Sequence, residues 1–420
     1  MMRSMYSAIS GLRSHQTKMD VIGNNIANVN TVGYKKQTVT FQEVFSQVIR
    51  GASAPEAGKG GTNPQQIGLG VDVGSINTIH TQGSTQRTDN PDDLMINGEG
   101  FFVVSDDVNL QNRYYTRAGN LSLDRDGNLV TVDGYKVLGY EMDENENRTN
   151  TITSIRINRS QTIEPTPTTR VEVRGNLDSG SEIGDEHLAD TIIKDSLGNS
   201  YVVTFKFTKA ADGNWDLSID AVKPQTGDGT DITATLIPAS VTLEFDEAGK
   251  LLSTNNVTLN ITKPGVNFGD GGNITIEFPA ANFTQYANEM DAKPYAMDGN
   301  SSGSLEGYTI DSKGVVYGVF SNGQSKALAQ LVLAKFDNPM GLQKMGSNLF
   351  IDSRNSGEPQ YGAADTGGFG SVVSGSLEMS NVDLAYEFTE MITTQRGFQA
   401  NSRIITVSDE MLQELVNIKR

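Results

Sequence analysis

The sequence of 420 residues contains no cysteine and few histidines. The absence of cysteine excludes disulfide bonds, thiolate catalysis and cysteine-ligated metal sites. The three histidines, His15, His80 and His187, lie far apart in the sequence, which argues against a histidine-based metal site. We therefore expect no metal and no cofactor.

Long apolar runs and basic residues are also scarce. No stretch of 18 apolar residues occurs, so we expect no membrane insertion. The opening residues, MMRSMYSAISGL, lack the apolar core of a secretory signal peptide. The 33 Lys and Arg are outnumbered by 51 Asp and Glu, which gives a net charge of −18. Such an acidic surface repels phosphate groups, so we expect no nucleic-acid binding.

The N-terminal region has apolar residues at alternating steps of four and three. This spacing predicts an amphipathic helix of about 25 residues that begins near Met5. The apolar residues expected to mediate assembly from this helix are Met5, Ile9, Leu12, Met19 and Ile26.

The C-terminal region predicts a longer helix of the same kind. Residues 379–419 contain no proline and a single glycine, Gly397. A repeat of 3.5 residues is typical of coiled-coil packing. The apolar residues expected to mediate assembly from this helix are Leu384, Phe388, Met391, Phe398, Ile405, Leu412 and Val416.

The two ends carry opposite charge. Residues 1–50 hold six bases and two acids, and residues 378–420 hold seven acids and four bases. Opposite charge suits helices that lie side by side, although single surface pairs are weak. Two unrelated surface helices are the alternative explanation of the pattern.

The middle of the chain predicts β structure. Residues 51–75 are rich in Gly, Ser, Pro and Gln and predict an extended connector. Beyond them, three segments in which Asp stands three residues before Gly predict hairpin turns with Gly in a left-handed conformation. The three pairs are Asp124/Gly127, Asp246/Gly249 and Asp311/Gly314.

These patterns predict a mainly β fold with α-helical termini, in which a terminal coiled coil accompanies two β domains. The outer β domain, residues 145–289, is expected to be inserted in the inner one because its Thr-, Asn- and Asp-rich composition differs from its surroundings. The other predicted parts are residues 1–34 with 378–420 as the helical domain, 35–70 as the connector, and 71–144 with 290–377 as the core β domain.

The candidate catalytic motifs are weak. LDRDGNL resembles a calcium loop, but its glycine comes too early and no acid follows at the required position. GLGVDVG lacks dinucleotide-binding spacing. The neighbouring acids Asp92/Asp93 and Asp106/Asp107 would point to opposite faces of a strand, so turns explain them better than a glycosidase pair. We expect no catalytic, cofactor-binding or metal residues, and no enzyme.

Several blocks of the chain nevertheless resemble one known family. SAISGLRSHQTKMDVIGNNIANVNTVGYKKQ resembles the N-terminal signature of the bacterial flagellar rod and hook proteins, and residues 375–420, with QRGFQAN, resemble their C-terminal signature. LMINGEGFFVV and YYTRAGNLSLDRDGNLVTVDGYKVLGY resemble the core β domain of that family. Residues 145–289 match more loosely.

The resemblance implies a structural polymer subunit. The additional β domain is similar to that of the hook branch of the family. Hook subunits form a hollow, bendable helical tube that transmits motor torque to the filament. The alternative assignment is the distal rod subunit, which is shorter. The resemblance further implies export through the flagellar type III apparatus without a cleaved signal peptide. It also implies a location in the extracellular hook of the flagellar basal body. The implied partners are copies of the same chain, the adjoining rod, hook-cap and hook–filament junction proteins, and the export apparatus. A secreted carbohydrate hydrolase and an adhesin are rival hypotheses of other classes.

Four asparagines crowd the point where the first helix should end. Asparagine amides bond to backbone groups, and Gly33 permits a backbone angle that other residues avoid. We interpret this stretch as a specified joint rather than a simple helix cap. Its signature residues are Asn24, Asn25, Asn28, Asn30 and Gly33.

Overall fold

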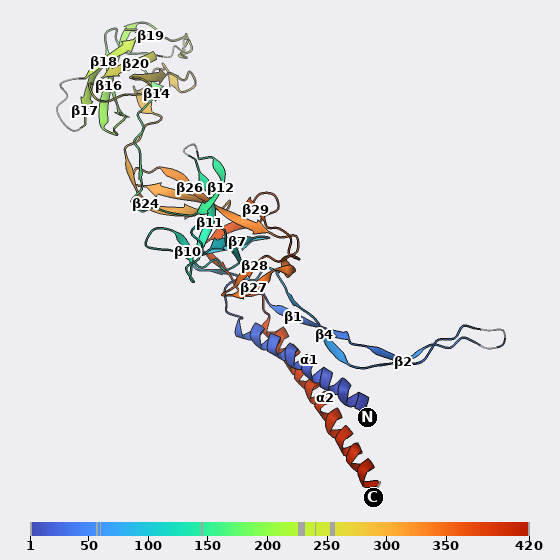
Figure 1. Cartoon of the computed structure of the whole chain (residues 1–420). Coiled ribbons are helices and arrows are strands. Elements are labelled where there is room, and N and C mark those ends of the chain that lie inside the picture. Colours follow the sequence, from blue (N-terminus) through green and yellow to red (C-terminus); the bar gives the residue numbers. More distant parts are fainter. Residues whose placement is uncertain are drawn as a thin grey trace. The chain divides into compact units, whose positions relative to one another are not determined.

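A computed structural model describes residues 2–55, 58, 60–143, 146–225, 232–239, 241–252 and 257–418 (Figure 1). The chain divides into two compact units. The first comprises residues 1–157, 309–317 and 326–420, and the second comprises 158–308 and 318–325. No helix in the described part of the chain combines the length and apolarity that a membrane crossing requires.

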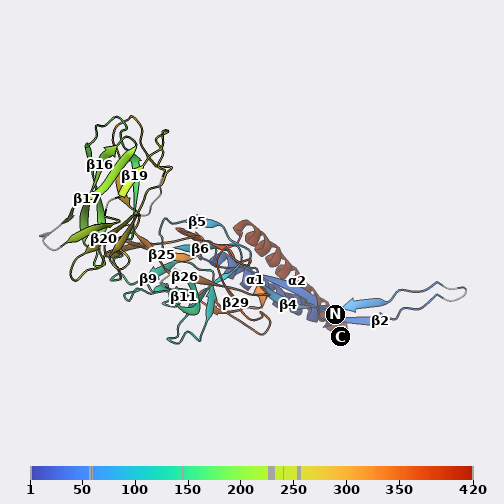
Figure 2. The same ribbon diagram turned by 90° about the horizontal axis from the view of Figure 1, so that it is seen from above.

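The first unit contains both long helices. Helix α1 covers Met2–Ala27 and helix α2 covers Leu384–Ile418, and they lie side by side (Figures 1 and 2). Asp383 caps α2, because its carboxylate accepts a hydrogen bond from the Ala385 backbone N–H at 2.9 Å.

Residues 35–70, expected to form an extended connector, lie mostly in a two-stranded ribbon. Strand β1 (Gln37–Glu43) pairs antiparallel with β4 (Val71–Thr78), and β2 (Ser46–Arg50) pairs with β3 (Gln65–Gly68). We call residues 37–55 and 60–78 the ribbon; β1 and β4 lie beside α1, and the end that carries β2 and β3 projects away from the helices (Figure 1). Its strands pair with each other, so their hydrogen bonds are satisfied without a larger sheet.

The rest of the first unit is a β body. Its central path runs β26-β11-β7-β8-β28-β27, and apolar strands such as Phe101–Ser105 are buried throughout. A strand buried on both faces needs a continuous apolar run rather than alternation. The strands are β5 (Thr85–Arg87), β6 (Leu94–Asn97), β7 (Phe101–Ser105), β8 (Tyr114–Thr116), β9 (Leu121–Leu123), β10 (Leu129–Thr131), β11 (Lys136–Met142), β12 (Arg148–Ser154), β26 (Ser325–Lys335), β27 (Gln343–Gly346), β28 (Leu349–Ile351), β29 (Gln360–Ala363), β30 (Ser371–Ser374) and β31 (Ser376–Glu378), with the 3-10 helix η1 (Pro339–Gly341).

The second unit is built from two sheets around one apolar core. The sheets have the orders β15-β16-β17-β19 and β18-β20-β21-β14-β22, and β23 joins the second through β14. Phe205, Phe207 and Trp215 are fully buried in this core. The strands are β13 (Thr162–Ile163), β14 (Arg170–Asn176), β15 (Glu186–Lys194), β16 (Ser200–Ala211), β17 (Asn214–Pro224), β18 (Thr233–Ile237), β19 (Val241–Glu244), β20 (Val257–Thr262), β21 (Asn273–Glu277), β22 (Phe283–Thr284) and β23 (Lys293–Ala296).

The boundary between the units falls inside strands. It crosses β24 (Gly303–Ile310) and β25 (Val315–Phe320) and the first residue of β26. The sequence had placed the inserted domain at 145–289; by contacts, residues 146–157 group with the first unit and 290–308 with the second. The reason lies in pairing, because β12 pairs with β11 of the β body and β23 pairs with β14 of the second unit.

Candidate assembly interface

The two terminal helices run antiparallel. Lys18 Nζ lies 2.5 Å from Glu390 Oε2, and Asn25 Nδ2 donates to Glu387 Oε2 at 3.2 Å. As α1 advances from Lys18 to Asn25, its partners on α2 therefore step backwards along the chain. Opposite charges at the two ends of the sequence meet at the Lys18–Glu390 pair.

The seam between the helices is built from small and polar side chains. A Cβ added at Gly11 would lie 2.6 Å from Asn401 Nδ2, and one added at Gly397 would lie 2.8 Å from the His15 ring. The backbones therefore approach more closely than large side chains permit. The buried residues of the seam region are Ala8, Gly11, Ser14, Ile22 and Asn25 on α1, and Glu387, Thr394 and Ser408 on α2.

On α2 the predicted assembly residues fall into two groups. The seam follows positions 387, 391, 394, 398, 401, 405, 408 and 412, which alternate in steps of four and three. Met391, Phe398, Ile405 and Leu412 lie on it and are half-buried. Leu384, Phe388 and Val416 are exposed in the single chain. The apolar pattern thus identified every second position of the seam. The seam positions between them are occupied by polar residues, which a search for apolar periodicity does not detect.

On α1 the predicted residues surround the seam rather than form it. Met5, Leu12, Met19 and Ile26 are half-buried and Ile9 is exposed. Three of the buried residues, Ala8, Gly11 and Asn25, lie one residue before a predicted position, which is a rotation of about 100° around the helix. Gly11 was the signal in the sequence that could have located the seam. Glycine inside a helix lowers helix stability, so its presence indicates that another chain segment packs closely there.

Large apolar side chains remain uncovered on the outer sides of α2. Val407 is 50% exposed and Leu415 51%, although both belong to a helix that packs against another. A contiguous exposed apolar surface marks a site of protein interaction. The other exposed apolar residues of α2 are Tyr386, Ile392, Ile404, Met411 and Ile418.

Asn25 connects the helix pair to the ribbon. Its side chain accepts a hydrogen bond from the Gln37 backbone N–H at 3.0 Å and donates to the Gln37 carbonyl at 2.8 Å. The Tyr34 hydroxyl also donates to its oxygen at 3.3 Å. Asn25 is 1% exposed, and its amide satisfies backbone groups that would otherwise lack partners where α1 meets β1.

The neighbouring asparagines shape the chain after α1. Asn28 donates to the Asn24 carbonyl oxygen at 2.8 Å, and Asn24 donates to the Tyr34 hydroxyl at 3.2 Å. Asn30 is exposed. Gly33 has φ +69°, and a Cβ there would lie 2.6 Å from the Ala118 backbone nitrogen. A larger residue at Gly33 would thus meet both backbone strain and a steric clash.

A buried ionic cluster follows directly. Lys35 Nζ lies 2.6 Å from Glu378 Oε1, and Arg117 NH1 lies 3.4 Å from Glu378 Oε2. The Lys35 and Glu378 side chains are fully buried. Gly83 donates its backbone N–H to the same carboxylate at 2.9 Å. Burial lowers the pKa of Lys35, and the neighbouring Glu378 carboxylate opposes that change.

The hairpin β27–β28 closes over this cluster. Lys344 donates to the Lys35 carbonyl at 3.2 Å, and its ammonium lies 4.8 Å from the centre of the Tyr34 ring. Asn348, in a left-handed conformation at φ 58°, donates to the Val32 carbonyl at 2.9 Å. Residues of the β27–β28 hairpin, far away in the sequence, therefore fix the segment that connects α1 to the β body. We call residues 24–37 with Glu378, Arg117 and this hairpin the joint.

His80 lies beside the same cations. Its pKa is lowered to about 4, chiefly by burial and further by the positive charges of Lys35, Arg117 and Lys344. The His80 ring is 5.4 Å from that of Phe350. Neutral imidazole thus acts here as an aromatic packing group.

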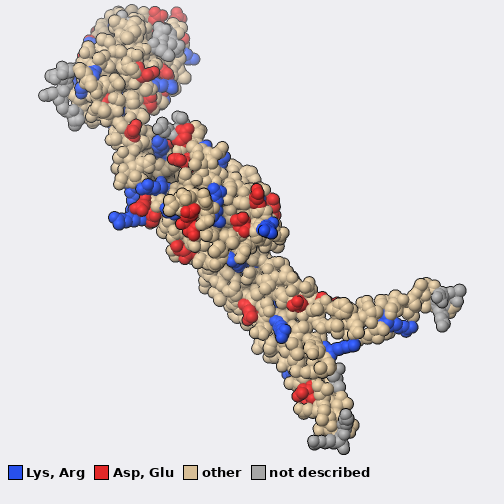
Figure 3. Space-filling model, in the orientation of Figure 1, with Lys and Arg blue, Asp and Glu red and all other residues tan. Residues whose placement is uncertain are grey.

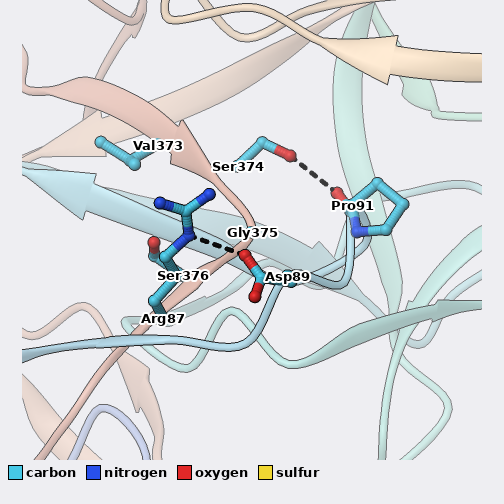
Figure 4. Close-up of a pocket in the computed structure, with 7 residues that line it drawn as sticks. All are labelled: Arg87, Asp89, Pro91, Val373, Ser374, Gly375 and Ser376. Atoms are coloured by element: carbon cyan, nitrogen blue, oxygen red, sulfur yellow. Dashed lines mark hydrogen bonds and ion pairs between the residues drawn. The ribbon is translucent and has the colours of Figure 1, made fainter.

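A cavity at the surface of the first unit differs from this buried cluster in that its charged residues are exposed. Its volume is 430 Å³, and it is lined by Arg87, Asp89 and the turn before β31 (Figure 4). Arg87 and Asp89 pair at 2.7 Å, but their side chains are 83% and 76% exposed, so the pair is a surface contact. Among the described residues no three His, Asp or Glu gather as a metal site would require.

Four family models match the chain. They are the flagella basal body rod protein at residues 5–35, the flagellar hook protein FlgE/F/G D1 domain at 95–174, the flagellar basal body protein FlaE D2 domain at 185–300, and the flagellar basal body rod FlgEFG protein C-terminal region at 373–418. Together they span the helices, the β body and the second unit.

Whole-length relatives agree with these matches. The chain is 39% identical to the flagellar hook protein FlgE of Borreliella burgdorferi and 36% identical to that of Treponema pallidum, each over 100% of both chains. It is also 34% identical to the flagellar basal-body rod protein FlgG of Bacillus subtilis over 100% of both chains. The chain is therefore similar to both rod and hook proteins of the family, and these two hook proteins are more similar to it than this rod protein is. The chain belongs to the flagellar hook protein family.

Proposed function

We propose that this chain is the structural subunit of a flagellar hook, which polymerises into a hollow, bendable helical tube and transmits motor torque to the filament. The supporting comparison is full-length similarity to hook proteins. The supporting structural observation is the uncovered apolar surface of α2, which other copies can bury. A single chain has no further helix to cover it among the described residues.

The distal rod subunit is the second candidate. It is favoured by the 34% identity to the rod protein of Bacillus subtilis. Electron microscopy of tubes assembled from the purified chain separates the two functions. Curved or supercoiled tubes support the hook, straight stiff tubes support the rod, and the absence of tubes under every polymerising condition contradicts both.

The chain acts without catalysis in this proposal. Its relatives are structural proteins, and the side chains of the Arg87–Asp89 pair are exposed rather than enclosed as in a catalytic site. Location in the flagellum follows from the family. Export through the type III apparatus without cleavage is testable by N-terminal sequencing of the protein recovered from hooks, where loss of an N-terminal segment would contradict it.

The partners proposed are copies of the same chain and the adjoining rod, cap and junction proteins. We also propose that the terminal helices line the channel and that the second unit forms the outer domain. Supporting this division, the second unit has a complete apolar core of its own. Because Trp215 is the single tryptophan, its fluorescence should report one cooperative unfolding of the second unit in the full chain.

A further inference from the structure

A hollow of 540 Å³ lies where loops of the two sheets of the second unit meet. The turn between β16 and β17 and the turn of residues 246–249 belong to the chain of one sheet. Ser179 and residues 285–287 follow strands β14 and β22 of the other sheet. Loops at the end of a β-sandwich are frequent positions of binding residues, because the sheets hold these loops in place.

An amide group without a partner borders this hollow. Gln285 is 7% exposed, and its side chain forms no hydrogen bond with any described residue. Neither its amide nitrogen nor its amide oxygen is sealed from solvent, so both can meet a ligand in the hollow. A largely buried polar group that lacks a partner is energetically unfavourable. The hollow therefore offers a ligand two N–H donors and one acceptor from a single side chain.

An aromatic ring stands beside the amide. Tyr286 is 47% exposed, and its ring packs against the turn before it, because a Cβ added at Gly249 would lie 2.8 Å from the ring atom Cδ1. The Tyr286 backbone N–H donates to Asn176 Oδ1 at 2.7 Å, and its carbonyl accepts from Asn176 Nδ2 at 3.0 Å. The ring is thus held in position while much of its surface stays open to a ligand.

Acidic side chains complete the hollow. Asp212, Asp246 and Glu247 line it, and none of the described residues that line it is Lys, Arg or His. The side chain of Asp212 is 98% exposed and lies 4.0 Å from the ammonium of Lys209, which donates to two backbone carbonyls at 2.8 Å each. Figure 3 shows both acidic and basic side chains on the second unit, so the lack of bases is a property of the hollow and not of the whole unit.

A carbohydrate satisfies these features better than a basic peptide side chain does. The C–H face of a sugar ring packs on an aromatic ring. Each sugar hydroxyl accepts and donates, so hydroxyls can accept from the N–H groups of Gln285 and donate to the carboxylates. Ammonium and guanidinium groups only donate, and they would leave those N–H groups without an acceptor. The carboxylates also attract an amino group on the sugar and repel a sugar that carries a carboxylate.

We propose that this hollow binds a carbohydrate, with a preference for an amino sugar. The sugar ring stacks on Tyr286, its hydroxyls bond to Gln285, and its amino group lies among the carboxylates of the hollow. All the residues concerned belong to the second unit of one chain. Carbohydrate binding is therefore independent of the proposed polymerisation and adds a recognition function to it.

Titration of the full-length monomer with a disaccharide of glucosamine tests the proposal, with calorimetry or ligand-observed NMR as the readout. We expect a Kd of about 1 mM, weaker binding of cellobiose, the matching glucose disaccharide, and no binding of glucuronic acid. Tyr286→Ala should weaken the binding at least about tenfold. Tyr295→Ala is the matched control, because Tyr295 is 49% exposed in the same unit and does not line the hollow. Equal effects of the two variants would overturn the proposal.

The polar groups are tested separately. Gln285→Ala should weaken the binding of both disaccharides about tenfold, and Trp215 fluorescence shows whether the variant is folded. Asp212→Asn with Glu247→Gln changes exposed side chains only, and it should remove the preference for the glucosamine disaccharide over cellobiose.

Two results would overturn the proposal. One is that neither disaccharide binds the natural chain at about 10 mM, tenfold above the expected Kd. The other is that a lysine-rich peptide binds in a Tyr286-dependent manner while the disaccharides do not, which would make the hollow a peptide site. Tube formation by Tyr286→Ala is measured in parallel and should match that of the natural chain. If the natural chain forms no tubes, the proposed structural function fails, whatever the sugar titration shows.

Discussion

The second unit and the helix pair bury their surfaces in opposite ways. The second unit encloses large residues such as Phe205, Phe207 and Trp215 at 0% exposure. The helix pair buries mainly small and polar residues such as Ala8, Ser14 and Thr394, and it leaves large apolar residues such as Val407 and Leu415 exposed. The second unit buries its apolar core within a single chain, whereas in the proposed polymer other copies cover the helix pair. In the proposed polymer, folding and assembly therefore depend on different residues.

The largest effect on folding is expected in the second unit. Phe205→Ala removes a fully buried ring and should lower the free energy of unfolding of this unit by about 3–5 kcal/mol. Trp215 fluorescence during denaturant unfolding measures it. Leu188→Ala, at a 54% exposed position of the same sheet, is the control and should change little. Equal losses from both variants would show that the core is not as closely packed as described.

The joint is expected to be the most sensitive part of the first unit. Glu378→Gln keeps the shape but leaves Lys35 and Arg117 without a buried counter-charge, which should cost about 3 kcal/mol. Hydrogen exchange in β7 and β26 measures the loss. Asp89→Asn removes the partner of Arg87 in an exposed pair and serves as the matched control, with no measurable change expected. If the two variants lost the same stability, the buried cluster of the joint would contribute no more than an exposed ion pair, which would contradict this prediction.

His80 should make the first unit sensitive to acid. Its pKa is about 4 in the folded chain and 6.5 in the unfolded chain, so the unfolded chain binds the proton more readily. The stabilisation is complete above pH 6.5 and is lost progressively as pH falls from 6.5 to 4, by about 3 kcal/mol. His80→Phe should remove this loss, and denaturant unfolding at pH 7, 5.5 and 4 checks it. Parallel pH curves for the two proteins would contradict the assignment.

The smallest effect on folding is expected from the helix residues. Phe398→Ala with Ile405→Ala should leave Trp215-monitored unfolding unchanged and move the β body by less than about 1 kcal/mol, because both side chains are only half-buried in the single chain. The same double variant should form no tubes under negative-stain microscopy. Thr393→Ala with Thr406→Ala, at exposed positions of α2, is the control. If the double variant Phe398→Ala with Ile405→Ala formed normal tubes, these residues would not be required for assembly, and the prediction would be wrong.

Turn chemistry was highly predictable from the sequence. At Asp124, Asp246 and Asp311 the Gly three residues later has positive φ and donates to the Asp carbonyl. Asp195 and Gly198 form a further turn of the same kind, which we did not predict although the two residues have the same spacing in the sequence. Local backbone demands decide such turns, so a short motif is sufficient to predict them.

The helix seam was only half predictable. The 3.5-residue period located Phe398 and Ile405, but Thr394 and Ser408 are polar, and periodicity of apolar residues does not detect them. The buried Lys35–Glu378–Arg117 cluster was missed altogether. Its members are distant in sequence and resemble ordinary surface charges until the fold brings them together.

Hydrogen exchange of the dilute monomer tests the central claim most directly. If the helix pair is completed by other copies, amides of α1 and of α2 beyond Glu390 should exchange rapidly, because isolated helices are marginal in water. Amides of the second unit's β16 and β17 should exchange slowly under the same conditions, as should those of Gly33 and Gly83 in and beside the joint. Slow exchange throughout Leu384–Ile418 in the monomer would contradict the account, since it would show that one chain stabilises its helices unaided.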